Sequence, residues 1–273
     1  MQIQSAQGPG FVQNAAKNTR QLAKILEKLS TAMSINRASD DAAGLAVSEQ
    51  LRTQIRGFKA AGQNITDAMS ALNIGEGAAN EVSSMLQRQR ELTIQAKSDT
   101  VNNSQRQDLD VEYQALSAEI NRISNTTQFN QQNVGAGRDL SSGTAQVQVG
   151  ANAGDSISLP PVDMTVAALG VSGTSIATAA QASTALASID TALNSLNNQR
   201  SNVGAMINRF ESAYNNLSVS EVNTQAAESA LRDQDMASGM AELVRAQLLQ
   251  DGGNRSFARY NEISRTNLLS LMQ

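Results

Sequence analysis

Residues 34–44 read Ser-Ile-Asn-Arg-Ala-Ser-Asp-Asp-Ala-Ala-Gly, and they separate two segments whose apolar residues fall at helical spacing. In both 12–33 and 51–72, apolar and small residues recur in alternating steps of three and four. Between these segments, Asn36 and Ser39 can hydrogen-bond to the nearby backbone and so compete with helix. Ser39 is a favourable N-cap, and the two aspartates after it would fall in the first helical turn, where the helix dipole favours negative charge. The sequence therefore predicts two long helices that meet at a short polar joint, although an ordinary helix-to-helix turn explains the same residues.

The composition favours thin helix-to-helix packing over a thick globular core. The chain has 273 residues, enough for one or two domains, with 40% hydrophobic but only 3% aromatic residues and no Trp. Much of the apolar content is alanine, and a narrow stripe of small apolar residues suits closely packed helices. The absence of Cys and His excludes disulfides, thiolate nucleophiles, Cys/His zinc sites and Ser-His-Asp triads. We therefore expect a protein that is not an enzyme and has no cofactor and no metal site.

Charge and hydropathy argue against nucleic acid and membrane partners. The net charge is −4, and although residues 1–37 carry five Lys and Arg against one Glu, no basic field runs along the body of the chain. The first thirty residues contain no apolar core of a secretory signal. The longest uncharged run, residues 164–189, is rich in Ser, Thr, Gly and Gln, whereas a bilayer span needs roughly 20 mostly apolar residues. We expect no nucleic-acid partner, no cleaved signal and no membrane span.

The helix predicted at residues 12–33 carries a basic stripe opposite its leucines. The stripe consists of Lys17, Arg20, Lys24 and Lys28. This pattern is typical of an amphipathic helix at a membrane surface and equally of a half-buried assembly helix, and the neighbouring helices favour assembly. We expect Gly8-Pro9-Gly10 to keep the extreme N-terminus out of this helix.

Two further helices are predicted before the character of the chain changes. The second runs from about residue 41 to residue 97, and the third has apolar residues in steps of four and three over 109–123. From about 134 to 180, Gly, Ser and Thr accumulate and the periodicity is lost. Within that region, segments 147–149 and 157–159 flank a turn-rich loop and predict a small hairpin.

The most regular repeat lies in the C-terminal half. Its steps alternate strictly between three and four, the period of a coiled-coil seam, through Leu186, Ile189, Leu193, Leu196, Arg200, Val203, Ile207, Phe210, Tyr214 and Leu217. Arg200 is the single charged residue of the seam, and we expect its stem to lie along the apolar surface with its head in water. A weaker helical pattern covers residues 230–249, and Gly252-Gly253 is expected to break it.

These elements predict a mainly α-helical fold. It would be an elongated rod of long antiparallel helices, a coiled-coil-like bundle, with a small β-hairpin in an irregular central insert. The terminal helices would occupy 1–40 and 230–273, the rod domain 41–133 and 181–229, and a short surface insert 134–180.

Five motifs along the chain resemble those of bacterial flagellins, and the likeness covers nearly the whole sequence. They are Asn36 with Ser39-Asp40-Asp41-Ala42-Ala43-Gly44, residues 86–92 (Leu-Gln-Arg-Gln-Arg-Glu-Leu), Gln128-Phe129-Asn130, residues 147–152 (Val-Gln-Val-Gly-Ala-Asn), and Val203-Gly204-Ala205 with Asn208-Arg209-Phe210. The chain departs from the family pattern at Gly8-Pro9-Gly10, at the region after Gly252-Gly253, and at Gln89, where many members have an aliphatic residue.

The resemblance implies a structural subunit that self-assembles into the bacterial flagellar filament used for motility. In that family the chain ends form an inner coiled coil that lines the filament channel, the middle helices form an outer tube, and the insert faces solvent. Subunits are exported unfolded through the flagellar type III apparatus and added at the filament tip, so the implied location is extracellular. The implied partners are further copies of the chain in a helical homo-oligomer, an export chaperone, and the hook-associated and cap proteins. The short insert would give a smooth, thin filament.

The same resemblance and the apolar spacing give three sets of candidate site residues. The subunit-assembly set is Leu22, Leu26, Leu29, Met33, Met240, Leu243, Val244, Leu248, Leu268 and Leu269. The rod-core set is Ile55, Phe58, Ile65, Leu116, Ile120, Leu193, Val203 and Phe210. A third set, Arg88, Leu92 and Glu112, matches positions through which flagellin monomers contact the vertebrate Toll-like receptor for flagellin. Arg88 and Glu112 are equally explained as solvated charges or as ion pairs between subunits.

Three alternative functions are weaker. A hook–filament junction protein would resemble flagellin at both ends, but that family commonly has Pro after the Asp-Asp pair, where this chain has Ala42. A flagellin-like cell-surface binding protein would need aromatic platforms for carbohydrate, and three Tyr with no Trp offer few. A metalloprotease insert would need two His ligands, and the sequence has no His.

Overall fold

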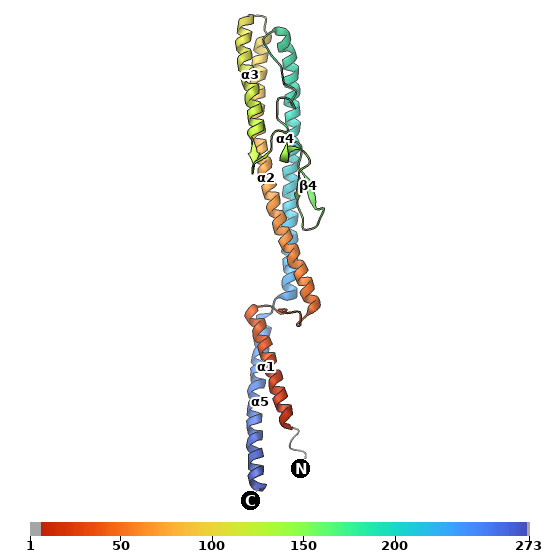
Figure 1. Ribbon diagram of the computed structural model, residues 1–273, viewed down its shortest axis with the longest axis vertical. Coiled ribbons are helices and arrows are strands. Elements are labelled where there is room, and N and C mark those ends of the chain that lie inside the picture. Colours follow the sequence, from red (N-terminus) through yellow and green to blue (C-terminus); the bar gives the residue numbers. More distant parts are fainter. Residues whose placement is uncertain (1–6, 272–273) are drawn as a thin grey trace. The chain divides into compact units, whose positions relative to one another are not determined.

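The computed structural model describes residues 7–271, with side chains from residue 10 to 266 except Ser264. Five long helices dominate it, in agreement with the predicted mainly α-helical fold (Figure 1). They are α1 (Gln7–Thr31), α2 (Ala42–Lys97), α3 (Asn103–Thr126), α4 (Ala179–Arg232) and α5 (Met236–Leu271). Two antiparallel strand pairs and one 3₁₀ turn, η1 (Asp139–Ser141), lie between α3 and α4.

The chain forms two compact units. Unit 1 comprises Met1–Thr53 and Asn223–Gln273, and unit 2 comprises Gln54–Val222. The division falls inside α2 and α4, whereas the predicted domain boundaries fall at helix ends near residues 40 and 230. The two units are described separately below.

In unit 2, α2 runs antiparallel to α4, and a regular seam joins them. Ion pairs connect Arg90 to Asp190, Glu76 to Arg200 and Lys59 to Glu221, so residue numbers rise along one helix as they fall along the other. The large buried side chains of α4 recur every seven positions: Ile189, Leu196, Val203, Phe210 and Leu217. They share one core cluster with residues of α2 and α3 that include Ile65, Leu86, Tyr113 and Ile120. A repeat of seven is the period of a coiled-coil seam.

The predicted hairpin in the insert is confirmed, and a second one was not predicted. Strands β3 (Gln146–Gln148) and β4 (Ser156–Ser158) pair antiparallel. Strands β1 (Gln128–Phe129) and β2 (Gln132–Asn133) form the second pair. Its two turn residues, Asn130 and Gln131, have φ of 50° and 64°. Asn tolerates this left-handed conformation, but Gln gives no turn signal in the sequence.

The segment of residues 134–180, which was predicted as a surface insert, contributes side chains to the core of unit 2. Its buried apolar residues are Val134, Ala136, Ile157, Leu159, Val162, Met164, Val166, Leu169, Val171 and Ile176. It also bonds to three helices: Asn64 of α2 donates to the Gln148 carbonyl, Asn121 of α3 accepts from the Val166 amide, and Gln199 of α4 accepts from the Asp163 amide. The segment therefore covers helix faces that would otherwise be exposed (Figure 1).

Two predicted helix breaks are absent. Helix α1 begins at Gln7 and includes Gly8-Pro9-Gly10, because Pro9 falls in the first turn, where a backbone N–H has no partner within the helix. Helix α5 continues through Gly252-Gly253. A glycine in a helix interior costs only about 1 kcal/mol relative to alanine, which a long helix tolerates.

Arg200 also differs from its prediction. Its guanidinium donates through Nε and Nη2 to Oε1 of Glu76 at 2.9 and 2.7 Å, rather than ending in water. The two side chains are about one third exposed. Since the pair is partly screened by solvent, we regard it as a link between α2 and α4 and not as a chemical site.

Arg106 holds the turn between α2 and α3. Its buried guanidinium donates to the carbonyls of Ala96 and Ser98 at 2.7 and 3.0 Å and to Asn103 Oδ1 at 2.9 Å. The last carbonyls of a helix have no partner within it, and a cation near that end is favourable. Asn102 caps α3 together with Gln105 in a reciprocal capping box.

We expect Arg106→Ala to lower the free energy of unfolding by about 2–3 kcal/mol, because two carbonyl acceptors lose a charged donor. Urea unfolding of the monomeric protein measures this change. Arg122→Ala is the matched control, since Arg122 is 60% exposed and pairs only across one helical turn with Glu119. The control should cost less than about 1 kcal/mol. Equal effects of the two variants would contradict the role given to Arg106.

Candidate subunit interface

Helix α2 begins at the end of the joint, directly after Asp41. Asp41 Oδ1 accepts from the backbone amides of Ala43 at 3.0 Å and Gly44 at 2.9 Å. Asp41 is therefore the N-cap, and the prediction of Ser39 in this role is wrong, because the carboxylate both accepts these bonds and carries the charge that the helix N-terminus favours. A Cβ at position 44 would overlap the Asp41 carboxylate and lie 2.8 Å from Ile35 Cδ1, so a larger residue there would have to displace the carboxylate that caps the helix.

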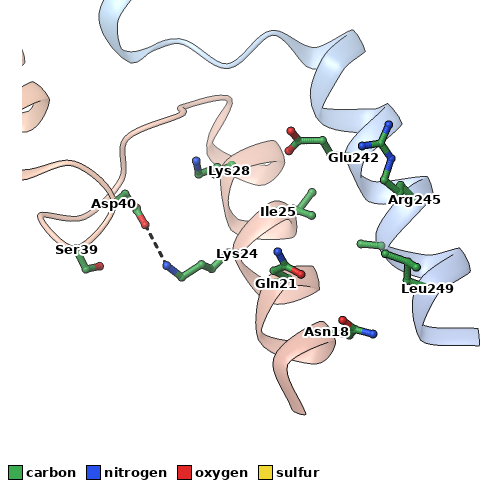
Figure 2. Close-up of a pocket in the computed structure, with 11 residues that line it drawn as sticks. Asn18, Gln21, Lys24, Ile25, Lys28, Ser39, Asp40, Glu242, Arg245 and Leu249 are labelled. Carbon is green, nitrogen blue, oxygen red and sulfur yellow. Dashed lines mark ion pairs between the residues drawn. The ribbon is translucent and has the colours of Figure 1, made fainter. Parts of the chain in front are cut away.

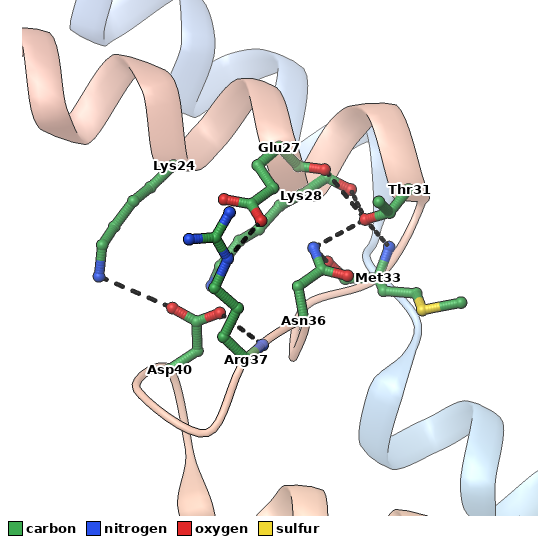
Figure 3. A network of polar contacts seen from close by, with 8 residues as sticks. All are labelled: Lys24, Glu27, Lys28, Thr31, Met33, Asn36, Arg37 and Asp40. Atoms are coloured by element: carbon green, nitrogen blue, oxygen red, sulfur yellow. Dashed lines mark hydrogen bonds and ion pairs between the residues drawn. The ribbon is translucent and has the colours of Figure 1, made fainter.

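A polar network holds the joint against the last turns of α1 (Figure 3). Arg37 Nε donates to Glu27 Oε1 at 2.8 Å, and the Arg37 amide donates to Asp40 Oδ2 at 3.1 Å. Lys24 pairs with the other oxygen of Asp40 at 3.6 Å. The hydrogen bond from the Arg37 backbone is the main cause that lowers the pKa of Asp40, with smaller contributions from Lys24 and Lys28. The Asp40 carboxylate is thus a stable acceptor at neutral pH.

Asn36 uses its side chain locally, as the sequence indicated. Its Nδ2 donates to Thr31 Oγ1 at 2.7 Å and lies 3.4 Å from the Met33 carbonyl. Thr31 Oγ1 in turn donates to the Glu27 carbonyl at 2.9 Å. These bonds hold Asn36 against the C-terminal end of α1, where the helix is closed by Ala32 with a φ of 56° and by the Met33 amide, which donates to the Lys28 carbonyl at 3.1 Å.

The two chain connections of unit 1 are bonded to each other. Met33 and Asp233 form an antiparallel bridge, in which the Ser34 amide donates to the Arg232 carbonyl at 2.7 Å and the Gln234 amide donates to the Ala32 carbonyl at 3.0 Å. The Arg232 side chain also donates to Glu49 Oε1 at 3.0 Å, and this bond is the main cause that lowers the pKa of Glu49. The chain therefore leaves α1 and enters α5 at one shared point.

Helices α1 and α5 pack against each other as an antiparallel pair. The Phe11 ring lies 6.2 Å from that of Phe257 and 6.1 Å from that of Tyr260. Near the other end of α1, a Cβ on Gly239 would lie 2.8 Å from Leu29 Cδ2, so Leu29 packs directly against the backbone of Gly239. The start of α1 thus meets the later part of α5, and its end meets the beginning of α5.

Two open grooves lie along this helix pair. The first has a volume of about 420 Å³ and is lined by polar and apolar surface in about equal parts, with Lys24 and Lys28 of α1 and Glu242 and Arg245 of α5 along it (Figure 2). The second has a volume of about 440 Å³ and is more apolar, with Phe11 and Phe257 among its lining residues. Both grooves lie within unit 1, and neither is filled by other described parts of the chain.

The outer side of α5 carries an exposed apolar row. We define the α5 row as Met236, Met240, Val244 and Leu248, which are 47%, 51%, 51% and 67% exposed. Residues four apart lie on one side of a helix, so the four side chains form a continuous stripe. On α1, Val12 and Leu26 are also exposed. Several large exposed apolar side chains in one row mark an interaction surface more often than a solvated face.

Comparisons with known proteins identify the family. The model of the bacterial flagellin N-terminal helical region matches residues 11–139, and that of the bacterial flagellin C-terminal helical region matches residues 186–272. The chain belongs to the bacterial flagellin family. It is 41% identical over 251 residues to a flagellin of Halalkalibacterium halodurans, with 91% of each chain covered. It is 37% identical over 264 residues to the flagellar filament 31.3 kDa core protein of Treponema maltophilum, with 92% of each chain covered.

A solved structure, that of Bacillus cereus flagellin, is similar with a TM-score of 0.49 and 31% identity, and it covers 57% of this chain and 88% of that one. As a member of the flagellin family, the protein is a structural subunit of the flagellar filament, a bacterial surface structure. None of the described helices is long and apolar enough to cross a membrane.

In this flagellin the predicted assembly residues divide into two groups. Leu22, Leu29, Met33 and Leu243 are half-buried, whereas Leu26, Met240, Val244 and Leu248 are exposed. The side chains of Leu268 and Leu269 lie outside the described residues. The predicted set left out further exposed apolar residues of these helices, among them Met236 and Leu249, although the spacing of four from Met240 pointed to the first.

The predicted rod-core residues lie in or against the core of unit 2, with one less buried. Ile65, Ile120, Val203 and Phe210 are buried. Phe58, Leu116 and Leu193 are partly buried and pack against the core, and Ile55 is half-buried. Tyr214, which the seam spacing placed beside them, is 46% exposed.

The predicted receptor-contact residues are not all accessible. Arg88 donates to Glu112 at 2.9 Å and to Glu91 at 3.1 Å, and these two carboxylates raise the pKa of Arg88. Arg88 and Glu112 are each about half exposed and link α2 to α3 within the chain. Leu92 is only 1% exposed and belongs to the core, so it offers no contact surface in this fold, and its prediction as a contact is wrong.

Proposed function

We propose that unit 1 carries the surface through which copies of this flagellin polymerise, with the α5 row at its centre. The observation that carries the proposal is the exposure of four apolar side chains in one row on α5. Removing one such side chain from water is worth roughly 1.5–3 kcal/mol, so contact with a second copy would supply a large part of the association free energy. The half-buried residues of α1 and α5 would keep the two helices paired behind that surface.

Unit 2 has a core of its own and does not need unit 1 to bury it. The core cluster is drawn from α2, α3, α4 and the segment between α3 and α4. By contrast, an isolated pair of amphipathic helices is marginally stable in water. Polymerisation and the fold of unit 2 should therefore be separable by truncation.

Deleting residues 1–38 and 232–273 should leave a soluble, helical monomer that forms no filaments. Circular dichroism measures its helix content, and electron microscopy with sedimentation measures its assembly. The full chain under the same conditions is the control and should form filaments. Long filaments of the truncated protein would contradict the assignment of the polymerisation surface to the terminal helices.

The finer features of the flagellin resemblance belong to the same proposal. The chain would be exported unfolded by the flagellar type III apparatus, added at the filament tip and located outside the cell, where the filament drives motility. Its ends would line the inner tube and would meet the export chaperone, hook-associated and cap proteins. Two observations support this route: the chain has no Cys that could oxidise on the way, and the thin interface of α1 and α5 favours folding upon assembly.

A receptor contact at Arg88 and Glu112 is the second part of the proposal. These two half-exposed charges lie on neighbouring helices and would be available in the free monomer. We expect Arg88→Ala and Glu112→Ala to lower activation of the vertebrate Toll-like receptor by monomer in a cell reporter assay. Arg122→Ala, an exposed ion-pair change elsewhere on α3, is the control. Unchanged receptor activation by both test variants would contradict the proposed receptor contact.

A further inference from the structure

The α5 row contains the two most exposed methionines among the described residues. Met236 and Met240 are 47% and 51% exposed. The other described methionines are buried or half-buried: Met33, Met69, Met85, Met164 and Met206. Thioether oxidation requires access of the oxidant to sulfur, so a water-soluble oxidant should reach the α5 pair before these five methionines.

We propose that Met236 and Met240 form a modification site at which oxidation to methionine sulfoxide prevents assembly of the free subunit. The inference rests on the proposed role of the α5 row as a polymerisation surface. The co-reactant is a two-electron peroxide oxidant such as hydrogen peroxide. The thioether sulfur attacks one peroxide oxygen, so an S–O bond forms while the O–O bond breaks. The second oxygen leaves as hydroxide, takes the proton of the first and becomes water; sulfur is oxidised and the peroxide is reduced.

The position of Met236 and Met240 explains why their oxidation should have a large effect on assembly and a small effect on the fold. Met236 and Met240 stand one helical turn apart, so both sulfoxides point to the same side of α5. Each sulfoxide is a polar hydrogen-bond acceptor, and the row neighbours Val244 and Leu248 have hydrocarbon side chains that donate no bond. Burying these acceptors in an apolar contact costs free energy. Since both side chains are about half exposed in the monomer, they contribute little to its own core.

The rate at which Met236 and Met240 are oxidised should also depend on whether the subunit is free or part of a filament. If the row is covered by a second copy, both sulfur atoms are hidden in the filament and become accessible only in the free subunit. Oxidation would therefore remove subunits from the assembling pool and leave existing filaments intact. Methionine sulfoxide is reducible by thiol-dependent reductases, one for each epimer, so the effect is reversible.

The test treats the purified full-length monomer with hydrogen peroxide and maps oxidised methionines by mass spectrometry. Seeded assembly is then followed by light scattering. We expect both residues to oxidise at least about fivefold faster than Met164. The critical concentration for assembly should rise at least about tenfold, and the two methionine sulfoxide reductases with a thiol should restore it. In preformed filaments the two residues should oxidise slowly.

Variants identify the responsible side chains. The readout is the ratio of critical concentrations with and without peroxide, measured within each variant, so a change in the untreated level does not matter. In Met236→Leu/Met240→Leu this ratio should be close to one, whereas Met69→Leu/Met85→Leu should keep the wild-type ratio. Leu replaces Met at nearly constant volume.

Two results would overturn the inference: normal assembly of protein shown to carry both sulfoxides, or equal peroxide inhibition of the α5 double variant. Both results can be distinguished from a failure of the proposed interface. That failure would appear as normal assembly of variants with charges in the α5 row. If the α5 double variant does not assemble at all, recovery of oxidised wild-type protein by the reductases decides the question.

Discussion

Phe210→Ala should lower the free energy of unfolding of the monomer by about 3–5 kcal/mol, because truncating a buried phenylalanine removes its contacts and leaves a cavity. Phe210 is fully buried and is, with Tyr113, the largest buried side chain of unit 2. With only 3% aromatic residues in the chain, few neighbours can fill the space. The melting temperature should fall by about 10 °C, measured by circular dichroism or calorimetry.

Tyr214→Ala is the matched control, since it lies one turn further along α4 and is 46% exposed. It should lower the free energy of unfolding by less than about 1 kcal/mol. Val203→Ala, at a buried seam position, should fall between the two. Filaments of Phe210→Ala should also depolymerise at lower temperature. A melting curve unmoved by Phe210→Ala would mean that the seam does not form the core of unit 2.

Charges in the α5 row should abolish assembly without unfolding the subunit. In Val244→Glu/Leu248→Glu, two carboxylates would have to leave water to make the proposed contact, at a cost of several kcal/mol each. The critical concentration for assembly should rise at least about 100-fold. Sedimentation and electron microscopy measure assembly, and circular dichroism of the monomer should be unchanged because both side chains are exposed.

An apolar pair of substitutions at the same positions is the control for this prediction. Val244→Leu/Leu248→Met keeps the row hydrophobic, so its critical concentration should stay within about tenfold of wild type, far from the effect of the charges. Filaments formed by the Glu variant at wild-type concentrations would show that the α5 row faces solvent in the filament.

The sequence predicted those parts of the fold in which apolar residues recur at a regular spacing. The alternation of three and four along α4 identified the buried positions Ile189, Val203 and Phe210, because helix period and burial follow the same spacing. It failed at Tyr214, because the alternate positions of the seam lie at the margin of the buried row: Leu193 and Arg200 are half-buried, and Tyr214 is 46% exposed. Residues 134–180 have no period, so their burial against the helices could not be inferred.

Two further kinds of feature could not be predicted from the sequence: contacts between residues far apart in the chain, and the choice between competing local interactions. The Arg232–Glu49 pair joins residues 183 positions apart, and no spacing rule relates them. At the joint, Ser39 and Asp41 are both good caps, and only the backbone path decides that Asp41 receives the two amides. The glycines at 252 and 253 gave a local signal for a break, which the continuous hydrogen bonding of α5 overrides.

The absence of cysteine allows a direct test of the proposed interface, because a single introduced thiol has no background. Leu248→Cys places that thiol at the most exposed position of the α5 row. The reaction of a water-soluble maleimide with this thiol should be fast in the monomer, at least about tenfold slower in filaments, and fast again after the filaments are depolymerised. Equal reaction rates in monomer and filament would contradict the account, since the row would then remain exposed to solvent after assembly.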